Sequence, residues 1–162
     1  MQPTHLLIAG LLAAQAINPQ IVGTSWIRNP DTDKMTGKTS VIYSIVPVSS
    51  EGTTHHREPL LSIICENSRF KYIDYSVGDS LASSPIDRSK NMIEYRIDDK
   101  KMRIEFWTDG GQHAYSKSAN LKELFTANRL LLRVSTFTGD VVTDEFHVAG
   151  LDTPTFHADC GK

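Results

Sequence analysis

The chain has 162 residues, of which 40% are hydrophobic and 22% are charged, and its formal net charge is -2. These figures are typical of a globular domain and exclude a disordered chain. The balanced charge argues against a nucleic-acid-binding protein. The sequence contains no run of about 18 apolar residues, the pattern that predicts a transmembrane helix.

The N-terminal region predicts an export signal. The apolar run LLIAGLLAA from Leu6 to Ala14 is followed by Ala14-Gln15-Ala16, the small-residue pattern that signal peptidase accepts. The run is apolar on all sides, whereas a surface helix would carry an apolar stripe. We therefore expect residues 1–16 to be a signal peptide and residues 17–162 to form a single β-rich domain. The alternative is a buried N-terminal helix of that domain.

Most of the remaining chain alternates between apolar and polar residues, which is typical of short β-strands separated by turn-forming residues. We expect eight or nine strands, including segments 24–28, 39–47, 60–66, 70–77, 92–98, 102–107, 130–135 and 141–148. Turns are expected at residues 29–33, 67–68, 98–100, 109–111 and 138–140, and polar loops at 49–59 and 78–90.

Helix signals are sparse. Ser118 can cap a helix over residues 119–127, and a short last helix is expected within residues 152–159, with Pro154 in its first turn. A parallel α/β fold needs a helix after nearly every strand, so this pattern disfavours it. The sequence predicts a mainly β fold, an antiparallel β-sandwich or barrel-like domain with one or two short helices.

The chain contains two cysteines, Cys65 and Cys160. An even cysteine count in an exported chain favours one disulfide, here between Cys65 and Cys160. The alternative is two unrelated buried thiols. Two cysteines this far apart in sequence do not make a zinc site by themselves.

One enzymatic hypothesis can be built from short motifs. Residues 78–81 spell GDSL, with Ser80 as nucleophile, and Asp144 and His147 form a D-x-x-H pair, as in GDSL-type esterases. The context argues against it, because the motif lies mid-chain after several strand-like segments and the oxyanion-hole elements are missing. We therefore expect no enzyme activity and no catalytic residues.

No other motif indicates a metal or a cofactor. His55 and His56 are adjacent, so on an extended loop they point in opposite directions. Asp31 and Asp33 begin like a calcium loop but lack its later ligands. There is no P-loop and no G-x-G-x-x-G, so we expect neither cofactor nor metal.

Two aromatic residues adjoin within one predicted strand. If that strand is regular, either Phe106 or Trp107 must point outward, where it would be available to a partner or a glycan. The alternative is an aromatic side chain at the rim of the core.

An ordered set of features extends from Trp26 to the last cysteine. In chain order it comprises Trp26, Lys34-Met35, a strand ending near Pro47, LSIICEN at 61–67, Tyr72-Ile73, YRIDD at 95–99, Trp107, a short helix, LLRV at 131–134, EFHVAGL at 145–151 and Cys160. In this order the chain resembles the periplasmic type VI secretion-associated accessory family, the TagO/VasI-like proteins. It departs from that family at Thr36-Gly37, where an acidic pair is usual, and in its last helix, which is usually rich in Leu and Ala.

The resemblance implies a periplasmic, non-enzymatic β-rich protein that assists type VI secretion assembly by binding a protein partner in the cell envelope. A second hypothesis is a periplasmic inhibitor of a cell-wall hydrolase, such as a lysozyme inhibitor, which would place one of the loops 49–59 or 78–90 in an active site. The esterase is the third.

Overall fold

The computed structural model describes residues 20–22, 26–52 and 59–161; the expected signal peptide lies outside them. The described residues form eleven strands and two short helices. The strands are β1 (Gln20–Val22), β2 (Trp26–Thr32), β3 (Thr39–Ile45), β4 (Ser49–Glu51), β5 (Leu60–Glu66), β6 (Arg69–Ser76), β7 (Lys90–Ile97), β8 (Arg103–Asp109), β9 (His113–Ser116), β10 (Arg129–Ser135) and β11 (Val141–His147). The helices are η1 (Ala119–Thr126), a 3₁₀-helix, and α1 (Pro154–Cys160).

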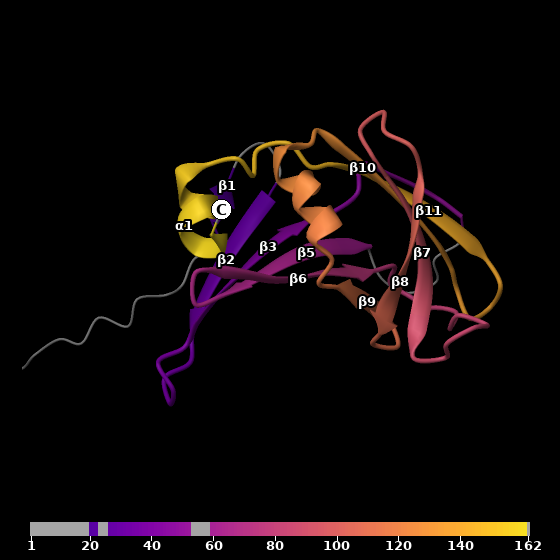
Figure 1. Ribbon diagram of the computed structural model, residues 1–162, viewed down its shortest axis with the longest axis horizontal. Coiled ribbons are helices and arrows are strands. Elements are labelled where there is room, and N and C mark those ends of the chain that lie inside the picture. Colours follow the sequence, from indigo (N-terminus) through magenta and orange to yellow (C-terminus); the bar gives the residue numbers. More distant parts are fainter. Residues whose placement is uncertain (1–19, 23–25, 53–58, 162) are drawn as a thin grey trace, which may run out of the picture.

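All strands belong to one antiparallel sheet, in the order β1-β2-β3-β5-β6-β9-β8-β7-β10-β11-β4. The sheet curls like half a barrel, so that its inner faces meet (Figure 1). Across this interior, the Tyr75 hydroxyl of β6 donates a hydrogen bond of 2.5 Å to Asp144 of β11, and the rings of Tyr75 and Phe146 lie 6.1 Å apart. The expected mainly β, barrel-like architecture is confirmed.

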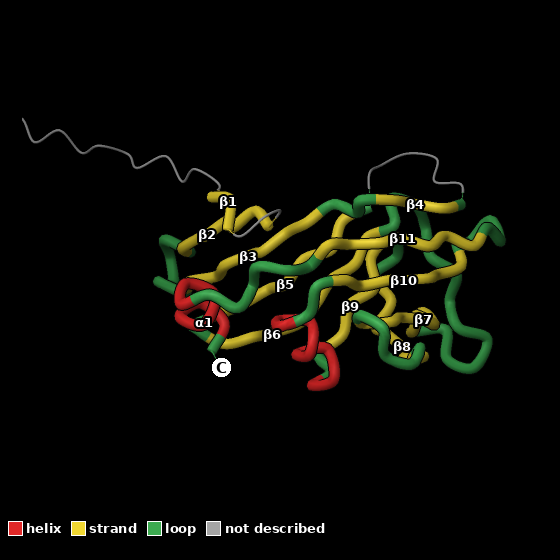
Figure 2. The backbone as a smooth tube through the Cα atoms, turned by 90° about the horizontal axis from the view of Figure 1, so that it is seen from above, coloured by secondary structure: helices red, strands yellow, loops and turns green. Residues whose placement is uncertain are grey.

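A short connection links the two parts of the curl. Residues 46–48 separate β3 from β4, so the chain passes from the first part of the sheet to the edge beside β11 (Figure 2). The Val48 backbone N–H donates to the Glu145 carbonyl at 2.7 Å, which begins the pairing of β4 with β11.

The inward-facing residues of the strands fill the curl. The two helices add Phe156 and Leu121 to this core. The largest fully buried side chains from the strands are Trp26, Trp107, Tyr43, Tyr75, Tyr95, Phe146, Leu61, Ile63, Ile73 and Ile93. Burying each such side chain contributes roughly 1.5–3 kcal/mol, so this cluster dominates the stability of the fold. Even the polar edge of Trp26 is satisfied, because its indole N–H donates to the Val148 carbonyl at 2.9 Å.

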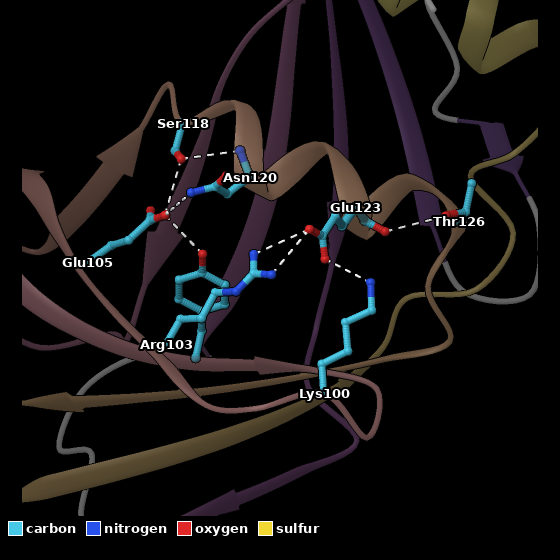
Figure 3. A network of polar contacts seen from close by, with 8 residues as sticks. Lys100, Arg103, Glu105, Ser118, Asn120, Glu123 and Thr126 are labelled. Atoms are coloured by element: carbon cyan, nitrogen blue, oxygen red, sulfur yellow. Dashed lines mark hydrogen bonds and ion pairs between the residues drawn. The ribbon is translucent and has the colours of Figure 1, made fainter.

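Helix η1 lies where the sequence places a helix, and Ser118 caps it by accepting the Asn120 N–H at 3.3 Å. Its buried residues Leu121 and Leu124 pack on the core. A polar network fixes it to the sheet (Figure 3). The helix expected from the sequence, residues 119–127, is one residue longer than the observed helix. Assignments of helix ends commonly differ by one or two residues.

Helix α1 is capped by Thr153, whose hydroxyl accepts the Phe156 N–H at 3.1 Å, and Pro154 lies in its first turn as expected. Cys160, its last residue, forms a disulfide with Cys65 of β5, with Cα atoms 5.1 Å apart. This geometry fits the expected pairing of the two cysteines.

A second contact holds α1 on the sheet. Asp159 accepts hydrogen bonds from the Arg28 guanidinium at 2.7 and 3.1 Å and from the Tyr43 hydroxyl at 2.5 Å. Burial alone would raise the pKa of Asp159, but the hydrogen bonds from Arg28 and Tyr43 outweigh it and lower that pKa. Asp159 is therefore held as a carboxylate between these two donors.

Two sequence-based expectations are wrong in detail. Residues 29–32 continue strand β2 instead of forming a turn, because they pair with β3 from Asn29↔Ile42 to Thr32↔Thr39. Residues 49–51 of the expected loop form β4. Within β6, the register shifts between Ile64 and Cys65 of the partner strand, so Phe70 packs on the core while Tyr72 lies on the outer face.

Candidate interaction surface

The residues of the esterase hypothesis are not brought together. Ser80 lies beside the turn between β10 and β11, because its carbonyl accepts a hydrogen bond of 2.8 Å from the N–H of Phe137 in that turn. His147 ends β11 six residues beyond Val141, which at a strand's rise corresponds to roughly 20 Å. Asp144 points into the core and bonds Tyr75, whereas His147 is exposed. Asp144 therefore does not orient His147, and His147 does not act as a base for Ser80.

The other sequence candidates have structural explanations. Asp33 accepts the N–H groups of Met35 and Thr36 and so stabilises a turn. Asp98 adopts a positive φ of 49° in the expected turn and accepts two backbone N–H groups. Over the described ranges, no group of three His, Cys, Asp or Glu residues is arranged to hold a metal. His55 and His56 lie outside the described residues.

The polar network under η1 contains two glutamates that sequence analysis did not single out. Glu105 accepts hydrogen bonds from Tyr95, Ser118 and Asn120, and Glu123 accepts from Lys100 and Arg103 (Figure 3). Burial, together with Glu105, raises the pKa of Tyr95 to about 12. Two carboxylates can serve acid–base chemistry, but the side chains here leave no cavity for a substrate. The network fastens η1 to the sheet.

An apolar patch lies on the outer face of β7 and β8. Met92 is 41% exposed, Met102 48%, Ile104 53% and Phe106 45%. The register pairs Met92 with Phe106 and Glu94 with Ile104, so these side chains are neighbours across the two strands. The sequence indicated that either Phe106 or Trp107 points outward. In the structure Phe106 is the exposed residue and Trp107 is buried.

Charged side chains border this apolar patch. A groove of about 160 Å³ runs from Met102 over Leu131 to Thr143, and Arg96, Arg133 and Glu94 line it. Glu94 and Arg133 form an ion pair at 3.4 Å. Methionine, phenylalanine and arginine at an apolar centre with a polar rim are the composition typical of protein–protein interfaces.

The loop 78–90 presents a second exposed apolar side chain, Ile86, which is 85% exposed. The buried Ser84 hydroxyl accepts the N–H groups of Ile86 and Asp87 at 3.2 and 3.4 Å. The Ser84 N–H donates to the Lys90 carbonyl at 2.6 Å, and the Lys90 N–H donates to the Asp87 carbonyl at 3.0 Å. These bonds close a turn over residues 84–90 in which Ile86 is exposed.

Sequence analysis did not single out the apolar patch, although Met102, Ile104 and Phe106 alternate along one segment, because alternation does not tell which face of a strand lines the core. The available signal was the pair Phe106-Trp107, which requires one outward aromatic ring.

Neither described helix has the length and apolar character needed to cross a bilayer. In comparisons with known proteins, no family model, no curated protein and no solved structure matches this chain.

Proposed function

We propose that this protein is an exported, non-enzymatic interaction module that binds a protein partner in the cell envelope through the apolar patch of β7 and β8. The observation that carries this proposal is the exposure of Met92, Met102, Ile104 and Phe106 side by side on the outer face of the sheet. An apolar patch with a charged rim on a soluble surface is a common mark of a binding site.

The setting that we propose is the periplasm, with the protein as an accessory factor for type VI secretion assembly. The ordered set of residues from Trp26 to Cys160 supports this assignment through its resemblance to the accessory family. The disulfide between Cys65 and Cys160 supports an oxidising compartment, because such bonds are rare in a reducing cytosol.

The test compares two exposed isoleucines on different parts of the sheet. Ile104→Asp places a charge in the patch, and we expect it to abolish release of the type VI secretion tube protein into the medium. The matched control is Ile27→Asp on β2, where the native side chain is 47% exposed. Both variants should melt within a few degrees of the wild type, since surface substitutions change stability by roughly 0.5 kcal/mol or less. Normal secretion by Ile104→Asp, or equal loss with Ile27→Asp, would contradict the proposal.

The hydrogen-bonded turn over residues 84–90 favours the second candidate, an inhibitor of a cell-wall hydrolase. A preorganised turn loses little conformational entropy on binding, so the exposed Ile86 is suited to enter the active site of an enzyme such as lysozyme. If this is correct, the purified protein inhibits lysozyme and Ile86→Asp weakens the inhibition at least tenfold. Met35→Asp, at a residue 93% exposed in another turn, should leave it unchanged. Absence of inhibition by the wild type excludes this candidate.

A further inference from the structure

A groove of about 390 Å³ lies along the outer face of β6 and β9. Strand β9 pairs with β8, so the groove lies beside the apolar patch but is lined by other residues. Its lining residues are Lys71, Tyr72, Asp74, Gly110, His113, Tyr115 and Lys117. The two strands pair Asp74 with Tyr115 and Ser76 with His113, so the sheet itself fixes the positions of these side chains.

The floor of the groove is aromatic. The rings of Tyr72 and Tyr115 have centroids 5.7 Å apart and planes inclined by 54°. Both side chains are half-buried, and Ile64 of β5, which pairs with Tyr72, is 8% exposed beside them. Two inclined, supported rings provide a fixed apolar surface on which a flat ligand face can pack.

A polar pair stands beside the rings. Asp74 Oδ2 lies 3.1 Å from His113 Nδ1. Burial raises the pKa of Asp74, and the neighbouring His113 offsets part of that effect. A carboxylate and an imidazole side by side accept and donate hydrogen bonds, which is the combination that sugar hydroxyls require.

Two lysines give the rim a positive character. Lys71 is paired with Glu66 at 2.9 Å, whereas Lys117 forms no ion pair with any residue in the described part of the chain. Asp74, the one acidic residue among those lining the groove, is already engaged by His113. A cationic ligand is disfavoured here, and an acidic group is matched by Lys117.

We propose that this groove binds a saccharide that carries a carboxylate. One face of the sugar ring packs on Tyr72 and Tyr115, its hydroxyls bond Asp74 and His113, and its carboxylate pairs with Lys117. The groove and the apolar patch share no residue, so substitutions in the groove test this proposal while the patch residues stay in place.

The test uses oligosaccharides that differ in charge. Trigalacturonate and the disaccharide of N-acetylglucosamine and N-acetylmuramic acid are titrated into the full protein, followed by NMR signals of the tyrosine rings. We expect at least one acidic probe to shift the signals of Tyr72 and Tyr115. The methyl ester of trigalacturonate and chitobiose, their neutral counterparts, should bind at least tenfold more weakly.

Two lysine variants locate the charge effect. Lys117→Met should reduce the affinity for the acidic probe to that of its neutral counterpart, whereas Lys122→Met, at an exposed position on η1, should leave it unchanged. Tyr115→Phe keeps the ring and should retain binding, and Tyr115→Ala should lose it while the melting temperature stays near that of Tyr115→Phe. The proposal is overturned if neither acidic probe binds, if the neutral probe binds equally well, or if the two lysine variants behave alike.

Discussion

We expect the variant with both Cys65→Ala and Cys160→Ala to melt roughly 8–20 °C below the wild type. The disulfide closes a loop with a sequence separation of 95. A loop of that size corresponds to roughly 4–5 kcal/mol of stabilisation through the lost freedom of the unfolded chain. In a domain of this size, each kcal/mol shifts the melting temperature by roughly 2–4 °C.

The location of the bridge explains why its loss should be felt at α1 first. This helix has seven residues, and a helix this short is not stable on its own in water. Apart from Cys160, its buried residue is Phe156, which packs edge-on against Tyr43 and Phe125. The carboxylate of Asp159 adds the contact with Arg28. Without the disulfide, these contacts alone hold the helix on the sheet.

Thermal unfolding followed by circular dichroism checks this prediction, and the single variants serve as controls. Because one bond is removed in each case, Cys65→Ala, Cys160→Ala and the double variant should lose nearly the same stability. Wild type treated with a reductant should match them. A double variant that melts within 2 °C of the oxidised wild type would refute the stabilising role of the bridge.

Local signals determined most of the strand positions. The segment 60–66 matches β5 exactly at both ends because apolar residues are followed by Asn67 and Ser68, whose positive φ values of 50° and 59° make a tight hairpin turn. Gly139, with a φ of 92°, lies in the turn 136–140 that connects β10 to β11. Ser118 and Thr153 cap helices through bonds to residues only two or three positions away.

The errors arose where pairing with distant residues overrode local preference. Asn29, Pro30 and Asp31 favour turns, yet they extend β2 because β3 pairs with them. Among the described residues, β1 pairs with β2 no further than Arg28, so the described neighbour of Pro30 is β3 alone, and such an edge position tolerates the missing N–H of a proline.

The candidate surfaces were harder to predict for the same reason. The groove of Tyr72 and Tyr115 exists because β6 pairs with β9, some forty residues later in the chain. Adjacent aromatic residues indicated that either Phe106 or Trp107 faces outward, but the choice between them depended on which face of β8 lines the curl.

Asp144 is the second residue at which we expect a large effect, and its effect depends on pH. This side chain is fully buried, and its Oδ2 accepts a hydrogen bond from the Tyr75 hydroxyl. Its Oδ1 has no hydrogen-bond partner within the described residues. Burial raises the pKa of Asp144, although hydrogen bonds from Ser50 and Tyr75 oppose that rise. The folded protein therefore holds this proton more tightly than the unfolded chain does.

The direction of the pH effect follows from this difference. Where the folded state binds more protons than the unfolded state, the free energy of unfolding falls as the pH rises. For Asp144, the loss begins near the pKa of about 3.9 in the unfolded chain and is complete above the raised pKa of the folded state. At neutral pH, the buried carboxylate thus lowers the stability of the protein.

We expect Asp144→Asn to remove this pH-dependent loss of stability, because the amide stays neutral and its oxygen can still accept the hydrogen bond from the Tyr75 hydroxyl. Its stability relative to the wild type should rise between pH 4 and pH 7, as measured by urea unfolding at each pH. Tyr75→Phe should do the opposite at pH 7 and cost about 1–3 kcal/mol, since it leaves the buried carboxylate without that donor. The exposed control Asp31→Asn should show no such trend. A constant difference between Asp144→Asn and the wild type across this range would show that Asp144 titrates alike in the folded and unfolded chains.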